Sequence, residues 1–344
     1  MLSSTAEKWN RPALYQEQNP DKVVRCVLCP HHCLLQDGQR GICRTRINRQ
    51  GVLYTLAYGN PCSLAVDPIE KKPLFHFHPG TSILSIATKG CNFRCLNCQN
   101  WDISQSLPEE SIHNEVLPEE VVRQALLHQT KSIAFTYTEP TVFYEYVLDT
   151  AVAAHKMGLK TVLISNGYIN EKPLLELCQY LDAANIDLKC FDEEIYHRLT
   201  GGRLQPVLDT LKTIRDQGLW LEITSLLVPG FSDGPERIQA MCDWLVANGF
   251  EDTPLHFSRY FPAFKLHHLP ATSEQSLLQA KKIAEATGIK YVYIGNIPGL
   301  HGENTYCPHC RHLLVERSGY VVRQNALDSG CCAFCGTRIP GVWA

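Results

Sequence analysis

The 344-residue sequence has no long apolar run, and no stretch reaches the about 18 apolar residues that a membrane-spanning helix needs. Residues 1–30 are polar and lack the apolar core of a signal peptide, so we expect no export. Neither sign of charge dominates, because 32 Lys and Arg face 35 Asp and Glu and the formal net charge is −3. We therefore expect no broad electrostatic binding of nucleic acid or of anionic membranes.

Hydrophobic residues make up 44% of the chain and charged residues 19%, a composition that supplies a buried core and excludes a disordered chain. Cysteine is the abundant feature: 16 residues, most of them in three groups within 26–43, 91–98 and 307–335. Disulfide-dense proteins are usually small and secreted. We therefore interpret the groups as metal sites of a cytoplasmic protein, and the isolated Cys178 and Cys242 as small buried hydrophobic residues.

Short β-rich runs alternate with segments whose apolar residues have helical spacing. The predicted strands are 83–88, 133–137, 161–165, 184–188, 221–227, 255–260 and 291–294. The predicted helices include 142–157, 173–181, 207–215, 238–247 and 277–286, and four of them stop at Gly158, Gly218, Gly249 and Gly288. This alternation with short connections predicts parallel strands joined by right-handed crossovers.

The number of strand–helix units sets the expected architecture. Six or so units over about 210 residues are too few for a complete eight-fold barrel. We predict an α/β fold, an open, partial parallel (β/α)6-type barrel over residues 81–300, with a doubly wound sheet as the alternative. A Cys-rich metal-binding cap would occupy residues 1–80, and a zinc-ribbon-like module residues 301–344.

The central cysteine group has the spacing C-x3-C-x2-C at Cys91, Cys95 and Cys98, directly after the first predicted strand. In both candidate architectures, chemistry belongs on the loops that follow the strands. Three cysteines on one loop bind three irons of a 4Fe–4S cube and leave the fourth iron open, whereas four cysteines suit electron transfer. Spacing alone leaves a zinc site with a distant fourth ligand as the alternative.

This loop resembles the signature of the radical S-adenosylmethionine (SAM) enzymes, which share a partial barrel, and the resemblance extends over roughly residues 80–300. It implies that Thr138 and Glu139, after the second strand, hold the amino group of SAM. It also implies that Asn166, Asp187 and Lys189 line the cofactor pocket. For Asp187 and Lys189 the alternative is a surface ion pair.

Four further strings resemble the radical enzyme of the AmmeMemoRadiSam system, which is related to activases of pyruvate formate-lyase. They are DPIEKKPLFHFHPG (67–80), GCNFRCLNCQNWDISQ (90–105), HFSRYFPAFK (256–265) and the tail over 304–343. This resemblance implies Memo-like and AMMECR-like proteins as partners.

Two positions depart from the family pattern. Asn97 stands where an aromatic or aliphatic residue usually precedes the third cysteine, so we expect Phe93 or Trp101 to contribute the adenine contact. Ile164 stands where activases of glycyl radical enzymes often carry an acidic residue, which argues against a literal activase role.

The resemblance implies reductive cleavage of SAM to methionine and a 5′-deoxyadenosyl radical, which takes a hydrogen from a protein or small molecule that the sequence does not identify. Such chemistry needs a low-potential donor such as flavodoxin or ferredoxin. The candidate substrate-side residues, each of which is equally readable as a structural group, are His256, Arg259, Tyr260 and Lys265.

Three other functions remain open at this point. A glycyl-radical-enzyme activase is the alternative within the enzymes. Outside them stand a zinc or iron–sulfur binding module, which predicts no SAM binding, and an electron-transfer module, which expects four ligands where this loop offers three.

The C-terminal group forms two knuckles, Cys307 with Cys310 and Cys332 with Cys335, around a predicted hairpin of 313–316 and 320–323. Four cysteines in this layout are typical of a structural zinc site, with iron–sulfur as the rival and Cys331 as a substitute for Cys332.

The N-terminal group has four thiols beside two histidines, His31 and His32. We predict either zinc or a second 4Fe–4S cluster here, and free cysteines in a packed cap are the third possibility. The candidate ligands are Cys26, Cys29, Cys33 and Cys43.

Overall fold

The computed structural model describes residues 11–111, 115–297 and 299–343, and an eight-stranded sheet forms its centre. The strands are β7 (Ser63–Pro68), β8 (Ser82–Ala87), β9 (Ser132–Phe135), β10 (Lys160–Ser165), β11 (Ala183–Asp187), β12 (Trp220–Leu227), β13 (Leu255–Arg259) and β14 (Val292–Gly295). Strands β8 to β14 lie side by side in chain order and parallel, and β7 pairs with β8 in the antiparallel direction.

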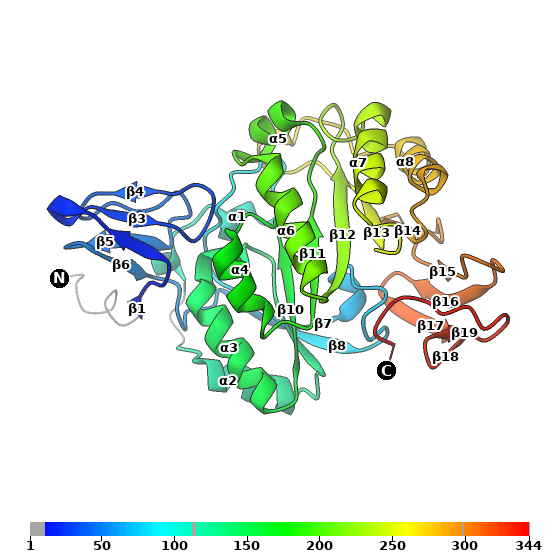
Figure 1. The fold of residues 1–344 in the computed structure, drawn as a ribbon, viewed down its shortest axis with the longest axis horizontal. Helices are drawn as coiled ribbons and strands as arrows, with labels where there is room; N and C mark the ends of the chain where they lie inside the picture. The colour runs from blue at the N-terminus through cyan, green and yellow to red at the C-terminus, as the bar shows by residue number, and fades with distance from the viewer. Residues whose placement is uncertain (1–10, 112–114, 298, 344) are drawn as a thin grey trace.

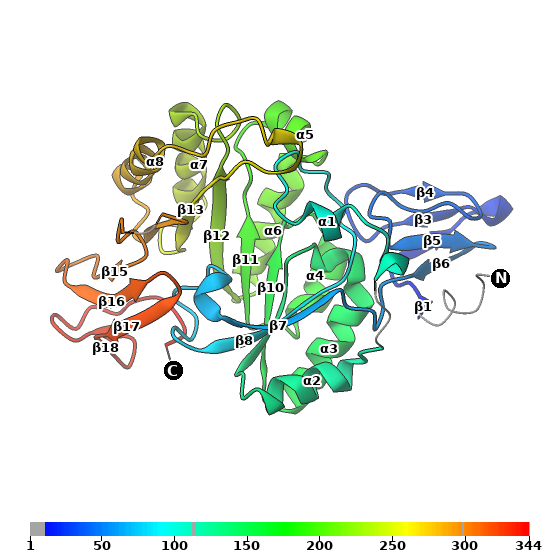
Figure 2. The same ribbon diagram turned by 180° about the vertical axis from the view of Figure 1, so that it is seen from behind.

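This strand order decides between the two predicted architectures. A doubly wound sheet reverses its order at a switch point, and no reversal occurs among the described strands, so that alternative is wrong. The sheet is strongly twisted and its two edges, β7 and β14, stay unpaired with each other in the described ranges (Figure 2). The predicted open, partial barrel is confirmed.

Most helices alternate with the strands and cover one face of the sheet, which is in front in Figure 1, whereas the short α1 lies in front in Figure 2. None of the described helices is long and apolar enough to cross a bilayer. Their bounds are α1 (Trp101–Ser104), α2 (Pro118–Leu127), α3 (Tyr144–Lys156), α4 (Glu171–Cys178), α5 (Glu193–Thr200), α6 (Leu204–Asp216), α7 (Pro235–Ala247) and α8 (Glu274–Thr287).

Local sequence signals explain where the helices begin and end. The Asp192 side chain caps α5 by accepting a hydrogen bond from the Ile195 N–H at 2.8 Å. The predicted glycine stops are confirmed, because each of these residues adopts the positive φ that glycine tolerates best: Gly158, Gly218, Gly249 and Gly288.

The segment that contains the string 67–80 crosses the predicted boundary at residue 80, since β7 belongs to the main sheet. The carboxylate of Asp67 is buried and accepts hydrogen bonds from Lys71, Lys72 and Ser85 at 2.7–2.8 Å, and from the hydroxyl of Tyr137. These bonds fasten the segment to β8 and to the loop after β9. The domain boundaries themselves stay predictions, and residues 1–10 of the predicted cap lie outside the described ranges.

The N-terminal segment forms two small sheets beside the main one, seen in blue at one end of the molecule (Figures 1 and 2). The first contains β1 (Arg11–Pro12), β5 (Arg46–Arg49) and β6 (Val52–Thr55), and the second β2 (Gln16–Gln18), β3 (Val24–Cys26) and β4 (Leu34–Leu35). A buried ion pair between Arg46 and Glu145 joins β5 to α3. The segment is therefore anchored to the helical layer of the barrel.

The C-terminal segment lies at the other end of the main sheet (Figure 1). Strands β16 (Leu313–Ser318) and β17 (Val321–Asn325) form the predicted hairpin, flanked by β15 (Thr305–Tyr306), β18 (Leu327–Asp328) and β19 (Cys331–Cys332). The ring of His76 contacts the Pro340 carbonyl at 2.7 Å and the Tyr293 hydroxyl at 2.5 Å. His76 thus connects the string 67–80, β14 and the C-terminal segment.

Candidate active site

The cysteine loop follows β8 and is fastened to the end of α5. The N–H groups of Arg94 and Leu96 donate to the carbonyls of Thr200 and Leu199 at 2.8 and 2.9 Å. These are backbone bonds between residues about a hundred positions apart, so they hold the loop whatever side chains lie between the cysteines. The loop lies at the carboxyl edge of the parallel strands, where the partial barrel places its chemistry.

The buried side chain of Phe93 anchors the cysteine loop to the protein core. Its ring is 1% exposed and packs against Tyr168 and Tyr196 at centroid distances of 4.9 and 6.1 Å. A ring buried in this way is not available to an adenine, so that expectation for Phe93 is wrong. Trp101 is 48% exposed and stacks on Phe264, and its contact with adenine stays a prediction.

Gly202 makes room for this anchor. A methyl group at this position would lie 2.7 Å from Cζ of Phe93 and closer still to Cε1. We expect Gly202→Ala to lower the free energy of unfolding by about 1–3 kcal/mol, as overpacking does, and to reduce iron retention by the loop. Urea denaturation and iron analysis measure both effects. Gly295→Ala is the matched control, because its methyl group meets nothing closer than Ser258 Oγ at 3.5 Å.

The three thiols of the loop are too far apart to share one ion. In the described part of the chain, the only group of three or more ligand atoms that lie within 4.8 Å of one another is the C-terminal one. A single tetrahedral zinc would bring its sulfurs to about 3.8 Å, given zinc–sulfur bonds of about 2.3 Å. A cube holds its thiolates farther apart because each binds a different iron, so the spread of the three thiols argues against a mononuclear ion, and the cube stays a prediction.

The surroundings of the thiols differ. Burial raises the pKa of Cys95 to about 12, although the ammonium group of Lys189 opposes this shift. Cys98 Sγ lies 3.2 Å from the hydroxyl of Ser104 on α1, and Cys91 Sγ accepts from the Phe93 N–H at 3.4 Å. Because the thiolate is the metal ligand, binding must displace protons from these buried thiols.

Glu139 connects the loops that follow β9 and β10. Its buried carboxylate accepts four hydrogen bonds, from the N–H and hydroxyl of Thr141, the hydroxyl of Ser165 and the N–H of Asn166, at 2.7–2.9 Å. Burial raises its pKa, and these four bonds oppose the rise. The carboxylate is thus heavily used within the chain, and its predicted contact with the amino group of SAM stays a prediction.

Asn166 lies against the first cysteine. Its amide Nδ2 donates to Asn92 Oδ1 at 2.8 Å and lies 4.0 Å from Cys91 Sγ. Asn92 in turn donates to the Tyr168 carbonyl at 2.9 Å. The structure therefore places Asn166 beside the loop and adds Asn92 as the residue that connects the two, while the contact of Asn166 with SAM stays a prediction.

Asp187 and Lys189 form an ion pair of 2.8 Å at the end of β11. The Lys189 side chain is 21% exposed and faces Cys95. Burial alone would lower the pKa of Lys189, but the charges of Asp187 and Cys95 raise it above its usual value. The ion pair thus lies at the edge of the site, and its ammonium group lies beside the thiol of Cys95.

Thr138 lies at the same edge of the sheet, and its hydroxyl donates a hydrogen bond to the Thr88 carbonyl at 2.8 Å.

Several polar atoms around the loop are buried and have no hydrogen-bond partner among the described residues. They are the side-chain oxygens of Thr88, Asn97, Tyr196 and Thr224. Buried polar groups are normally satisfied by protein or ordered water, and unpartnered atoms also occur away from the loop, such as Asn60 Oδ1 and Ser132 Oγ, so this set does not by itself identify a ligand site.

The four candidate substrate-side residues are largely structural. His256 is buried and bonds to Glu222 at 2.6 Å, and the Tyr260 hydroxyl donates to the Leu266 carbonyl at 2.7 Å. Arg259 donates to the Thr272 carbonyl at 2.9 Å. The Lys265 side chain is exposed, and the backbone N–H of Lys265 donates to the carbonyl of Leu96, which lies between the second and third cysteines. Of the four, Lys265 alone combines exposure with contact to the loop.

The C-terminal thiols converge on one point. Sγ of Cys307 lies 3.6 Å from that of Cys335, and Sγ of Cys310 lies 3.6 Å from that of Cys332. This spacing is close to that of four sulfurs around one tetrahedral ion. Cys331 is not part of the group, so the structure favours Cys332. The group can hold a metal, and its identity as zinc stays a prediction.

The neighbouring cysteine supplies a matched test of this site. We expect Cys310→Ala to reduce the metal bound at the C-terminal group to background, because three sulfurs close a tetrahedral site poorly. Cys331→Ala should retain the metal. Elemental analysis of zinc and iron in both purified variants measures this. Equal metal loss from the two variants would contradict a site made of Cys307, Cys310, Cys332 and Cys335 without Cys331.

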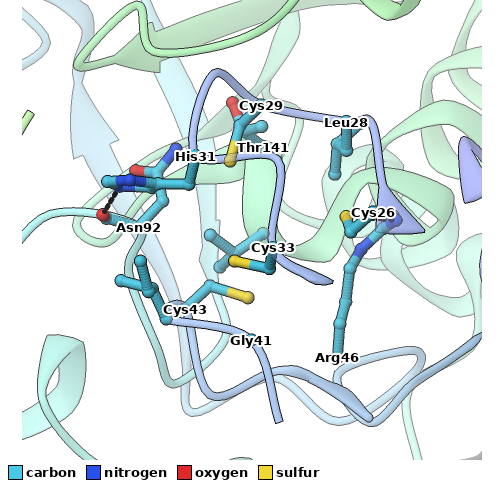
Figure 3. A pocket seen from close by; sticks show the side chains of 12 residues that line it. Cys26, Leu28, Cys29, His31, Cys33, Gly41, Cys43, Arg46, Asn92 and Thr141 are labelled. Carbon is cyan, nitrogen blue, oxygen red and sulfur yellow. Dashed lines mark hydrogen bonds between the residues drawn. The ribbon is translucent and has the colours of Figure 1, made fainter. Parts of the chain in front are cut away.

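The N-terminal thiols lie around a cavity whose wall includes Asn92, the neighbour of Cys91 (Figure 3). Sequence reasoning missed Asn92, although it stands inside the motif. It also missed the roles of Ser104 and Ser165, because their contacts with Cys98 and Glu139 come from tertiary structure.

Comparison with known proteins agrees with this site. The sequence model of the Radical SAM superfamily matches residues 85–245, a range that holds the cysteine loop, Glu139 and the Asp187–Lys189 pair. Uncharacterized protein MJ0808 of Methanocaldococcus jannaschii is 46% identical over 331 residues, which cover 96% of this chain and 98% of that protein.

Pyruvate formate-lyase 1-activating enzyme of Escherichia coli K12 is 25% identical over 219 residues, covering 60% of this chain and 89% of the enzyme. The crystal structure of SuiB of Streptococcus suis bound to S-adenosylmethionine aligns with 16% identity and a TM-score of 0.48, covering 66% of this chain and 53% of SuiB. Together with the cysteine loop at the carboxyl edge of the partial barrel, the superfamily match shows that this chain belongs to the radical SAM superfamily.

Proposed function

We propose that this chain is a radical SAM enzyme whose Cys91, Cys95 and Cys98 hold a 4Fe–4S cluster at the carboxyl edge of the barrel. The observation that carries the proposal is the set of three thiols, spread too widely for one ion, on a loop bonded to the end of α5. When bound, the cluster supplies the electron that cleaves SAM into methionine and a 5′-deoxyadenosyl radical, which takes hydrogen from the substrate.

The residues of the chain would bind and orient the cofactor. Glu139 holds the backbone after β9 and β10 in place through four hydrogen bonds. Asn166 lies near Cys91, and Asp187 and Lys189 lie near Cys95, where the ammonium of Lys189 compensates negative charge. Thr138 would contribute from the loop after β9. The hydroxyl of Tyr196, which is close to Lys189 and Cys95 and has no partner among the described residues, would offer a further polar group to the ligand.

The test is reductive cleavage of SAM. The protein is reconstituted anaerobically with iron and sulfide, reduced with dithionite and incubated with SAM, and 5′-deoxyadenosine and methionine are quantified. We expect both products in equal amounts. Absence of 5′-deoxyadenosine from protein whose cluster is spectroscopically intact would contradict the proposal and favour an electron-transfer or binding module.

A glycyl-radical-enzyme activase is the second candidate, since the match to the E. coli activating enzyme spans 89% of that enzyme. Ile164, on β10, stands where an acidic residue is frequent in activases. Incubation of the reduced protein with SAM and a pyruvate formate-lyase-type protein, followed by electron paramagnetic resonance, distinguishes the two. A glycyl radical signal supports the activase, and SAM cleavage without that signal supports another substrate.

The finer proposal is that the enzyme acts in the AmmeMemoRadiSam system, with Memo-like and AMMECR-like proteins as partners and flavodoxin or ferredoxin as donor. It is supported by the strings over 67–80, 90–105 and 256–265. Size-exclusion chromatography of the purified chain mixed with each partner checks it, and no shift in elution with either would contradict it.

A further inference from the structure

The four N-terminal cysteines reach one cavity from four separate points of the chain. Cys26 ends β3, Cys29 lies in the following turn, Cys33 precedes β4 and Cys43 precedes β5. All four line the cavity, and Figure 3 shows their sulfurs around it. Gly41 lies against two of the sulfurs, since a methyl group there would meet those of Cys43 and Cys33 at 3.5 and 3.8 Å. Two small sheets thus place four sulfurs around one space.

The four sulfurs around the cavity are spread more widely than a single ion needs. No three ligand atoms of this group lie within 4.8 Å of one another in the described part of the chain, in contrast to the C-terminal four. The same protein therefore shows two four-cysteine sites of different width, and only the C-terminal one has the dimensions of a tetrahedral ion. The N-terminal space suits a cluster whose irons separate the sulfurs.

Polar groups in the wall suit an anionic cluster of thiolates. Arg46 is 1% exposed, lies 3.8 Å from Cys26 Sγ through its Nη1, and has an Nε without a partner among the described residues. Behind the wall, the hydroxyl of Thr45 donates to the Val142 carbonyl at 2.7 Å and lies 3.3 Å from Cys43 Sγ. The remaining wall is largely apolar, with Leu28, Ile42 and Val142. Donors to sulfur and a dry lining are the features by which proteins hold and tune iron–sulfur clusters.

The cavity shares a wall with the central site. His31 Nε2 lies 2.8 Å from the carbonyl oxygen of Asn92, the bond drawn in Figure 3, and Asn92 directly follows Cys91. Thr141, also in the wall, donates twice to Glu139. A group bound in the cavity would therefore lie next to the loop that carries the central thiols.

We propose that Cys26, Cys29, Cys33 and Cys43 bind a second 4Fe–4S cluster, with a cysteine on every iron, beside the central loop. Full ligation by protein suits a cluster that exchanges electrons, in contrast to the three-cysteine central site.

The test removes the central site so that the second one is observed alone. The chain carrying Cys91→Ala, Cys95→Ala and Cys98→Ala together is reconstituted anaerobically, and iron, labile sulfide and zinc are counted. We expect it to retain about half of the wild-type iron and sulfide, since each cube holds four of both. Dithionite reduction should produce the electron paramagnetic resonance signal of a reduced cluster that does not respond to SAM. Sulfide is the decisive quantity, because a single metal ion carries none.

Two further variants assign the remaining iron. Adding Cys29→Ala to the triple variant should remove its sulfide, whereas adding Cys62→Ala, an isolated and partly buried cysteine, should not. In the otherwise native chain, Cys29→Ala should halve the iron and leave a SAM-responsive signal, which guards against misfolding of the multiple variants.

The proposal is overturned if the triple variant contains no sulfide while native Cys29→Ala keeps its full iron, or if Cys29→Ala removes zinc instead of iron. The measurement does not depend on SAM cleavage. If the triple variant holds a cluster, the proposal of a second cluster is supported even when the intact enzyme forms no 5′-deoxyadenosine. Failure of the proposed function would therefore not contradict the second cluster.

Discussion

Cys95→Ala should abolish formation of 5′-deoxyadenosine, to the level of a blank without protein. The middle thiol of the loop is flanked by Lys189 and by the backbone bonds of Arg94 and Leu96, so no other described cysteine is placed to replace it. Two remaining thiolates hold a cube poorly, and the central iron should be lost with the activity. Product is quantified by chromatography, and iron and sulfide are counted in the same preparation.

Cys178→Ala is the matched control for this loss. Cys178 is buried on α4 and belongs to none of the three groups. Its replacement should cost on the order of 1 kcal/mol of stability, as removal of a small buried group does, and leave the cleavage rate unchanged. Retention of wild-type cleavage by Cys95→Ala would show that the loop does not carry the chemistry.

Glu139→Ala should have the largest effect on stability. Its carboxylate accepts from the buried N–H groups of Thr141 and Asn166, which would lose their acceptor. We expect the free energy of unfolding to fall by roughly 2–6 kcal/mol, because each buried donor left unpaired costs about 1–3 kcal/mol. The affinity for SAM should fall as well, since the loops after β9 and β10 lose their common anchor. Urea denaturation and equilibrium SAM binding of the anaerobic protein measure the two effects.

Two variants separate the causes of this loss. Glu285→Ala removes an exposed carboxylate with one weak ion pair of 3.8 Å and should change stability by less than about 0.5 kcal/mol. Glu139→Gln keeps an acceptor for Thr141 but turns an N–H group toward one donor, so an intermediate loss is expected. An unchanged urea midpoint in Glu139→Ala would rule out the anchoring role.

The barrel was predictable because its signals are local. Alternating strand and helix patterns, together with the glycines after the helices, specify parallel strands in chain order, and the structure has this arrangement. The pairing of β7 with β8 was not predictable in the same way. The apolar Leu64 and Val66 are exposed and the one buried side chain is that of Asp67, so no inward-facing apolar stripe marks the strand. Only the sheet itself shows that β7 forms one edge.

The site was predictable where spacing along the chain decides it. The C-x3-C-x2-C run and the C-terminal knuckles place ligands within a few residues of one another. The positions of Asn166 and the Asp187–Lys189 pair came from family resemblance, and the structure brings them to the loop. The burial of Phe93 under Gly202 could not be read from the motif, because the two residues are brought together by α5 and the loop after it.

The sequence by itself determined the class of the protein: a barrel of parallel strands, three cysteine groups and one loop with three closely spaced cysteines. Only the tertiary structure decided how widely the sulfurs of each group are spaced. The N-terminal and C-terminal groups have four cysteines each, yet one surrounds a cavity and the other draws its sulfurs to 3.6 Å. The reason is that ligand type follows from residue identity, whereas the width of a site depends on how distant segments pack around it.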